Sequence, residues 1–205
     1  MNMGKAIVYI HGKGGSAAEA EHYRPLFPDC EVLGFDYEAE TPWEAGSEFA
    51  AYFNTVRQNY DSVSVIANSI GAFFVMNAPI NTHINRAFFI SPVVDMEKLI
   101  TDMMGWAGVT ESELCEKKEI ETPFGETLKW EYLCYVRSNP IRWSVPTHIL
   151  YGEKDNLTSF ETISAFAGKI GASLEVMPGG EHWFHTKEQM AFLDAWLVNQ
   201  YHFKE

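Results

Sequence analysis

Six short runs rich in β-branched and aromatic residues recur along the chain, separated by longer segments with helical periodicity. They are residues 5–12 (KAIVYIHG), 30–37 (CEVLGFDY), 62–68 (SVSVIAN), 86–92 (RAFFISP), 147–152 (THILYG) and 173–178 (SLEVMP). Nearly continuous apolar character is typical of strands covered on both faces, as in a parallel sheet. Because strands that alternate with helices require right-handed crossovers, the pattern predicts a three-layer α/β sandwich with a mostly parallel sheet of about six strands.

Capping-box pairs predict where the intervening helices begin. These pairs are Ser16 with Glu19, Thr41 with Glu44, Thr158 with Glu161, and Thr186 with Gln189. After the second pair, Phe49, Phe53, Val56 and Tyr60 fall on one helical stripe. Such a stripe is expected to face the core.

One interval, residues 93–145, breaks the alternation of strand and helix. Its sequence is helical in character, with interruptions at Gly105, Pro123, Gly125 and Pro140. A connection this long between successive strands is usually a functional lid or an insertion. We therefore expect one domain over residues 1–205 with a helical cap or lid inserted at 93–145. Its aromatic and methionine side chains either line an apolar pocket or form the cap's own small core.

Composition excludes several classes of function. The chain has 205 residues, 46% of them hydrophobic, which suits one well-filled core. A net charge of −13 with scattered basic residues argues against a nucleic-acid partner. No signal peptide or membrane span is expected, since no apolar run reaches about 18 residues. The cysteines, Cys30, Cys115 and Cys134, lack CxxC spacing, which favours reduced thiols and a cytoplasmic location.

Ser69 lies in ANSIG (residues 67–71), where an apolar strand-like run passes into a helix-like one. A serine on such a turn adopts a strained backbone, and its hydroxyl is lifted off the end of the sheet. Ala67 and Gly71 are the positions where larger side chains would clash as strand and helix pass closely. These are the physical parts of a nucleophile elbow, although a serine here could also merely cap a helix.

A serine hydroxyl needs a base and an orienting acid, which should follow later strands. Asp155 follows the run at 147–152, and His182 follows the last run, giving the chain order Ser, Asp, His. Two rivals lie nearby. Glu153 competes with Asp155 as the acid, and His185 competes with His182 as the base.

The first run ends in HGKGG (residues 11–15), where glycines let the backbone approach a ligand. The backbone N–H of Lys13 can then form an oxyanion hole with that of Ile70. His11 is expected to orient this loop through hydrogen bonds. The remaining histidines outside these motifs lack metal-ligand spacing, so neither a metal nor an organic cofactor is expected.

Taken together, HGKGG, ANSIG, YGEKD and GGEHWF resemble the α/β-hydrolase superfamily in order and placement over nearly the whole chain. The resemblance implies a serine hydrolase that passes through an acyl-enzyme. It assigns Ser69 as nucleophile, His182 as general base and then acid, and Asp155 as the group that holds the imidazole. It also implies that residues 93–145 are a cap inserted after the fourth strand. The first strand already carries the oxyanion loop, so the resemblance is to a minimal version of the fold.

We therefore expect a carboxylesterase-like enzyme that acts on a small or medium uncharged ester. Thioesterase, amidase or lipase activity would use the same groups. Gly12, Asn68, Trp106 and Trp183 are the candidate substrate-binding residues. The alternative is a ligand-binding protein that keeps the hydrolase fold and turns over slowly or not at all. The sequence makes no prediction of oligomeric state.

Overall fold

The computed structural model describes residues 4–202 and contains the predicted parallel sheet. Its strands are β1 (Lys5–Ile10), β2 (Glu31–Phe35), β3 (Ser62–Asn68), β4 (Arg86–Ile90), β7 (Thr147–Gly152) and β8 (Ser173–Met177). They are joined in the order β2-β1-β3-β4-β7-β8, and every neighbouring pair is parallel. The prediction of an α/β sandwich with a mostly parallel sheet of about six strands is confirmed.

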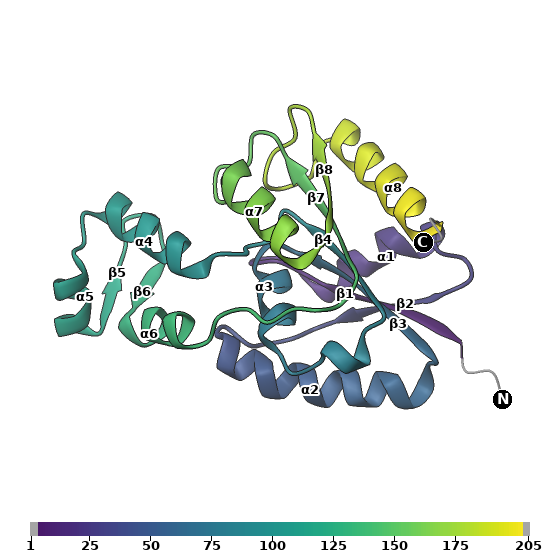
Figure 1. Ribbon diagram of the computed structural model, residues 1–205, viewed down its shortest axis with the longest axis horizontal. Helices are drawn as coiled ribbons and strands as arrows, with labels where there is room; N and C mark the ends of the chain where they lie inside the picture. The colour runs from purple at the N-terminus through teal and green to yellow at the C-terminus, as the bar shows by residue number, and fades with distance from the viewer. Residues whose placement is uncertain (1–3, 203–205) are drawn as a thin grey trace. The chain divides into compact units, whose positions relative to one another are not determined.

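Helices cover both faces of this sheet, as Figure 1 shows. They are α1 (Ala20–Tyr23), α2 (Pro42–Asn59), α3 (Ser69–Asn77), α7 (Phe160–Ile170) and α8 (Lys187–His202), with short 3-10 helices at Ala17–Glu19, Arg24–Leu26 and Asn81–His83. On one face, Tyr9, Ile66 and Phe88 share a buried cluster with Trp196 of α8. On the other face, the ring of Phe49 in α2 packs edge-on to aromatic rings that include Phe35.

Most of the predicted helix starts are present. Ser16 with Glu19 and Thr41 with Glu44 form reciprocal capping boxes. Thr186 and Gln189 also exchange backbone-to-side-chain hydrogen bonds, at 3.3 and 3.2 Å. The start predicted at Thr158 is one residue early.

Helix α7 begins at Phe160, and Ser159 is its N-cap, whose side chain accepts from Thr162 N. The reason for the difference lies upstream. The N–H of Thr158 already donates to Asp155 Oδ1, at 3.0 Å, as part of the preceding turn.

The sheet register gathers the carboxyl ends of four strands at one edge. Ile10 at the end of β1 pairs with Ala67 of β3, and Asn68 at the end of β3 pairs with Ile90 of β4. Ile90 in turn pairs with Leu150 of β7. In a parallel sheet, residues that follow these strand ends converge on one crevice.

The described residues form two compact units. One consists of the residues up to Val94 together with those from Arg142 onward, and the other is Asp95–Ile141. The second unit contains α4 (Met96–Ala107), α5 (Glu111–Lys117), β5 (Glu119–Glu121), β6 (Thr127–Lys129) and α6 (Trp130–Ser138). The strands β5 and β6 pair antiparallel, so this unit is not purely helical as the sequence suggested. Residues 1–3 and 203–205 of the predicted domain lie outside the described part.

Candidate active site

Ser69 lies at the junction of β3 and α3 in a strained backbone conformation. Its φ is +49°, in the left-handed region that non-glycine residues rarely adopt. Asn68, the N-cap of α3, is still extended, so the chain reverses direction within one residue. The Ser69 side chain is therefore raised from the carboxyl end of the sheet at the N-terminus of a helix, where N–H groups favour developing negative charge.

The small neighbours of Ser69 are needed for this turn. A Cβ added to Gly71 would lie 2.2 Å from the carbonyl oxygen of His11, a distance that no side chain tolerates. A Cβ on Gly12 would lie 3.3 Å from Ser69 Cβ. The loop that follows β1 is therefore packed directly against the start of α3.

Ser69, His182 and Asp155 form a continuous hydrogen-bonded relay. Ser69 Oγ lies 2.8 Å from His182 Nε2, and His182 Nδ1 lies 2.7 Å from Asp155 Oδ2. A carboxylate only accepts hydrogen bonds, so Nδ1–H donates to Asp155 and Nε2 is left to accept the serine proton. The Asp155 side chain is fully buried and that of His182 is 14% exposed.

Asp155 is held by backbone donors as well as by the imidazole. Its Oδ1 accepts from Leu157 N at 2.8 Å and from Thr158 N at 3.0 Å. These two bonds fix the carboxylate on the turn after β7, so Oδ2 remains directed at His182. The sequence-predicted acid is thus both oriented and shielded from water.

Two glycines bring the His182 loop to the end of β7. A Cβ on Gly152 would lie 2.4 Å from the carbonyl oxygen of Glu181, and one on Gly180 would lie 3.2 Å from Gly152 Cα. The backbones therefore touch at Gly152 and Gly180. The close approach explains why the sequence has glycine on both sides of the Asp155–His182 contact.

The rival residues take other roles. Glu153 Oε2 accepts from Gly179 N at 2.7 Å and so supports the loop that carries His182. His185 Nδ1–H donates to Trp183 O at 2.8 Å, and this side chain is exposed. The structure brings His182 and Asp155 to Ser69, and it does not bring His185 or Glu153 there.

The loop predicted to supply the oxyanion hole is a tight turn. Gly15 N–H donates to Gly12 O at 3.1 Å, and Gly14 has φ +74°. His11 Nδ1–H donates to Gly12 O at 2.9 Å, which agrees with the role expected for His11 in orienting this loop. Its ring also stacks on Tyr37 with ring centroids 4.3 Å apart, and the Tyr37 hydroxyl donates to His11 O at 2.8 Å. The Lys13 side chain is exposed.

The remaining predicted substrate-binding residues differ in their surroundings. Trp183, next to His182, is 72% exposed and stacks on His185 at 4.6 Å. Asn68 turns its amide away from solvent and donates to the Tyr9 hydroxyl at 2.8 Å. Trp106 belongs to the Asp95–Ile141 unit, where it is 57% exposed and packs edge-on to Phe124.

Sequence reasoning missed two residues that contact the elbow, Val93 and Tyr9, and the link from Tyr9 to Glu19. Val93 N–H donates to Ser69 O at 3.1 Å, so the segment after β4 supports the turn. Tyr9 and Glu19 are hydrogen-bonded to each other, and Tyr9 also contacts Asn68. The signal available in the sequence was a tyrosine inside an otherwise aliphatic strand, which needs a partner for its hydroxyl when buried.

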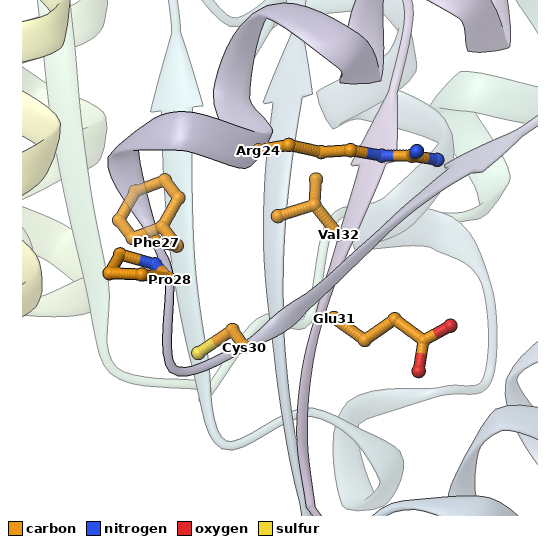
Figure 2. A pocket seen from close by; sticks show the side chains of 6 residues that line it. All are labelled: Arg24, Phe27, Pro28, Cys30, Glu31 and Val32. Atoms are coloured by element: carbon orange, nitrogen blue, oxygen red, sulfur yellow. The ribbon is translucent and has the colours of Figure 1, made fainter.

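A separate surface hollow of about 260 Å³ lies far from the relay. Figure 2 shows its six lining residues, which come from one stretch of chain between Arg24 and Val32. Glu31 pairs with Ala6 near the start of β1, so the hollow lies at the amino edge of the sheet, opposite the Ser69 edge. It takes no part in the chemistry of the relay.

Within residues 4–202, no three histidine, cysteine or acidic side chains are grouped closely enough to hold a metal ion. No helix in the same range combines the length and apolar character needed to cross a membrane.

The fold is shared with solved structures, although no protein-family model and no curated protein sequence matches the chain. Alpha/beta hydrolase domain-containing protein 10 from mouse superposes with a TM-score of 0.76 at 16% identity, over 96% of this chain and 89% of that one. Est1E from Butyrivibrio proteoclasticus, solved with ferulic acid bound, has a TM-score of 0.73 at 17% identity, over 96% and 88%. An esterase from Exiguobacterium antarcticum has a TM-score of 0.63 at 16% identity, over 98% and 92%. These likenesses show that the chain has the α/β-hydrolase fold, with a parallel six-stranded sheet and helices on both faces.

Proposed function

We propose that the chain is a serine hydrolase that cleaves a carboxylic ester, or a related acyl bond, of a small to medium uncharged substrate. The observation that carries the proposal is the relay from Ser69 through His182 to Asp155, with both distances under 3 Å. Two of the structural neighbours are named as esterases or hydrolases, which agrees with acyl-transfer chemistry.

The first half of the reaction follows from the relay. Ser69 Oγ attacks the substrate carbonyl carbon while its proton passes to His182 Nε2. Asp155 stabilises the imidazolium that forms and keeps Nδ1 protonated. The carbonyl oxygen becomes an oxyanion, and the N–H groups of Ile70 and Lys13 are the proposed donors to it. When the tetrahedral intermediate collapses, the alcohol leaves with the proton from His182.

The second half uses the same groups in reverse. A water molecule attacks the acyl-enzyme carbonyl, and His182 Nε2 takes its proton. Collapse of this second intermediate breaks the bond to Ser69 Oγ, which recovers the proton from His182. The acid product leaves, and the enzyme returns to its starting state with no cofactor involved in the proposed cycle.

We also propose that the insertion, residues 93–145, acts as a cap that selects substrates. Its test is replacement of the Asp95–Ile141 unit by a short Gly/Ser linker. The expected result is that Ser69-dependent hydrolysis of an acetate ester survives while preference among longer acyl groups is lost. Unchanged selectivity would contradict a selecting role.

The deciding experiment for the function measures hydrolysis of para-nitrophenyl esters of increasing acyl length. Ser69→Ala, Asp155→Ala and His182→Ala should each lose activity by about 10³-fold or more. His185→Ala serves as the matched control and should keep it. A fluorophosphonate probe should label wild type and not Ser69→Ala.

Two outcomes would reject an esterase. Wild-type protein that is folded but neither hydrolyses the esters nor takes the probe would favour the ligand-binding alternative. Activity that survives in Ser69→Ala would place the chemistry elsewhere.

A further inference from the structure

An oxyanion hole stabilises a transition state only if its donors are fixed in advance. One proposed donor, Lys13 N–H, lies in a loop with glycine at positions 12, 14 and 15. Glycine leaves a backbone unusually free, so this loop needs bracing from outside. The structure contains such a brace on the side of the sheet covered by α1 and α8.

The brace is a chain of hydrogen bonds from the elbow to the end of the loop. Asn68, the residue before Ser69, donates from Nδ2 to the Tyr9 hydroxyl at 2.8 Å. The Tyr9 hydroxyl donates to Glu19 Oε2, and Glu19 Oε1 accepts from Ser16 N–H at 3.1 Å. Asn68, next to Ser69, and Ser16, three residues after Lys13, are thus joined through the side chains of Tyr9 and Glu19.

The direction of each bond in this chain is fixed. Tyr9 is completely buried, and its ring centroid lies 5.0 Å from that of Tyr23. Burial raises the pKa of the Tyr9 phenol well above its usual value, and nearby Tyr23 and Glu19 raise it further. The hydroxyl therefore keeps its proton, which it donates to the carboxylate, and its lone pair is left to accept from Asn68.

The loop also packs on the Glu19 carboxylate directly. A Cβ added to Gly15 would lie 2.7 Å from Glu19 Oε1 and 2.9 Å from His11 Cβ. The backbone at Gly15 therefore lies between these two side chains. A displaced Glu19 would leave the loop without this support.

We propose that Tyr9, Glu19 and Asn68 are positioning residues that set the Gly12–Ser16 loop against Ser69 and so fix the oxyanion hole. This inference rests on the proposed hydrolase function. In this role the three residues act on the reacting atoms only through the backbone N–H of Lys13. Their loss should weaken transition-state binding while substrate binding changes little.

The test compares Tyr9→Phe with wild type on a para-nitrophenyl ester, with rates expressed per serine labelled by a fluorophosphonate. A displaced donor is expected to lower kcat by about 10- to 100-fold while KM stays within about twofold. The affinity for a trifluoromethyl ketone, which forms a tetrahedral oxyanion adduct with the serine, should fall by the same factor as kcat.

Two further variants serve as matched comparisons. Tyr201→Phe removes a hydroxyl that lies 2.8 Å from Cys30 Sγ, and it should leave kcat unchanged. Glu19→Gln keeps one acceptor oxygen for either Tyr9 or Ser16 N–H, so it should lose less activity than Glu19→Ala.

The possible results distinguish failure of the positioning role from failure of the proposed hydrolase function. If Tyr9→Phe lowers only the fraction of labelled serine or the stability, while kcat per labelled site is unchanged, the role is structural and the inference is wrong. A fall in kcat without a matching fall in ketone affinity overturns it too. If wild type shows no Ser69-dependent activity, the proposed function fails and the inference fails with it.

Discussion

Gly71 approaches His11 so closely that a Cβ at position 71 would lie 2.2 Å from the His11 carbonyl oxygen. This contact lets α3 start directly against the end of β1. Because the contacted atom belongs to the backbone, a side-chain rotamer change cannot relieve the clash. The contact therefore fixes how near Ser69 lies to the loop that follows β1.

Gly71→Ala should destabilise the protein and impair the site together. Overpacking of this kind costs about 1–3 kcal/mol in the free energy of unfolding, measured by urea denaturation. Gly168→Ala is the matched control, since it is also a helical glycine but has no atom within 4 Å of an added Cβ. It should stabilise α7 by about 0.5–1 kcal/mol. Equal effects at the two positions would contradict the steric argument.

Asp155→Asn should separate orientation from folding. The amide oxygen can still accept from the N–H groups of Leu157 and Thr158, so the turn after β7 should persist. The amide N–H₂ would instead face His182 Nδ1 as a donor, which favours the tautomer with a proton on Nε2. That tautomer cannot accept the serine proton, so kcat should fall by about 10³–10⁴-fold at unchanged stability.

Glu153→Gln is the control for the preceding variant, because it keeps an oxygen for Gly179 N–H and removes only a charge. Its kcat should stay within about threefold of wild type. A steady-state assay of both variants, with circular dichroism to check folding, decides the matter. If Asp155→Asn also stays within about threefold, its carboxylate does not orient the base.

The sheet and the relay residues could be predicted because the sequence marks strand ends strongly. Each apolar run became a strand, and Ser69, Asp155 and His182 each follow one of them. Parallel strands place such residues at one edge whatever the details of packing. The strained turn at Ser69 was predicted from the same pattern, whereas the strand order is known only from the structure.

Other features depend on contacts that a local pattern does not contain. Tyr9 and Asn68 are 59 positions apart, and no spacing rule pairs their side chains. Helix α7 begins one residue later than predicted because Thr158 N–H already donates to Asp155 Oδ1. Ser159 is therefore the N-cap. The hairpin β5–β6 has strands of three residues each, too short for an alternation signal.

Tyr37 should make stability depend on pH above about 10. Burial raises the pKa of its phenol above the usual 10.0, and the charges of Glu48 and Glu19 add to this. The folded protein then holds the proton more tightly than the unfolded chain. The contribution of this phenol to the free energy of unfolding is fully present below its pKa in the unfolded chain. Above that pKa the contribution is lost as the pH rises, by about 1.4 kcal/mol per pH unit.

Removing this phenol should therefore flatten the alkaline loss of stability. Urea unfolding of wild type and Tyr37→Phe, measured at intervals from about pH 8 to pH 12, gives the comparison. The difference in the free energy of unfolding should be constant below about pH 9 and shift in favour of Tyr37→Phe at higher pH. A difference that stays constant over the whole range would show that Tyr37 ionises equally in both states.

Trp183 offers the last test, because it is next to His182 in sequence and yet 72% exposed. A large apolar ring left in water beside a proposed catalytic base suits contact with an apolar part of the substrate. Trp183→Ala should change the free energy of unfolding by no more than about 0.5 kcal/mol, as is usual for an exposed side chain.

The same substitution should lower kcat/KM for a hexanoate ester by about tenfold, since burial of a few methylene groups on the ring contributes about 1–2 kcal/mol. An acetate ester, too short for that contact, is the control within the same variant and should change by less than about threefold. His185→Ala removes the ring stacked on Trp183 and should leave the rates for both esters within about threefold of wild type. An equal loss for both esters would mean that Trp183 supports His182 rather than the acyl group, and no loss for either would remove it from the substrate site.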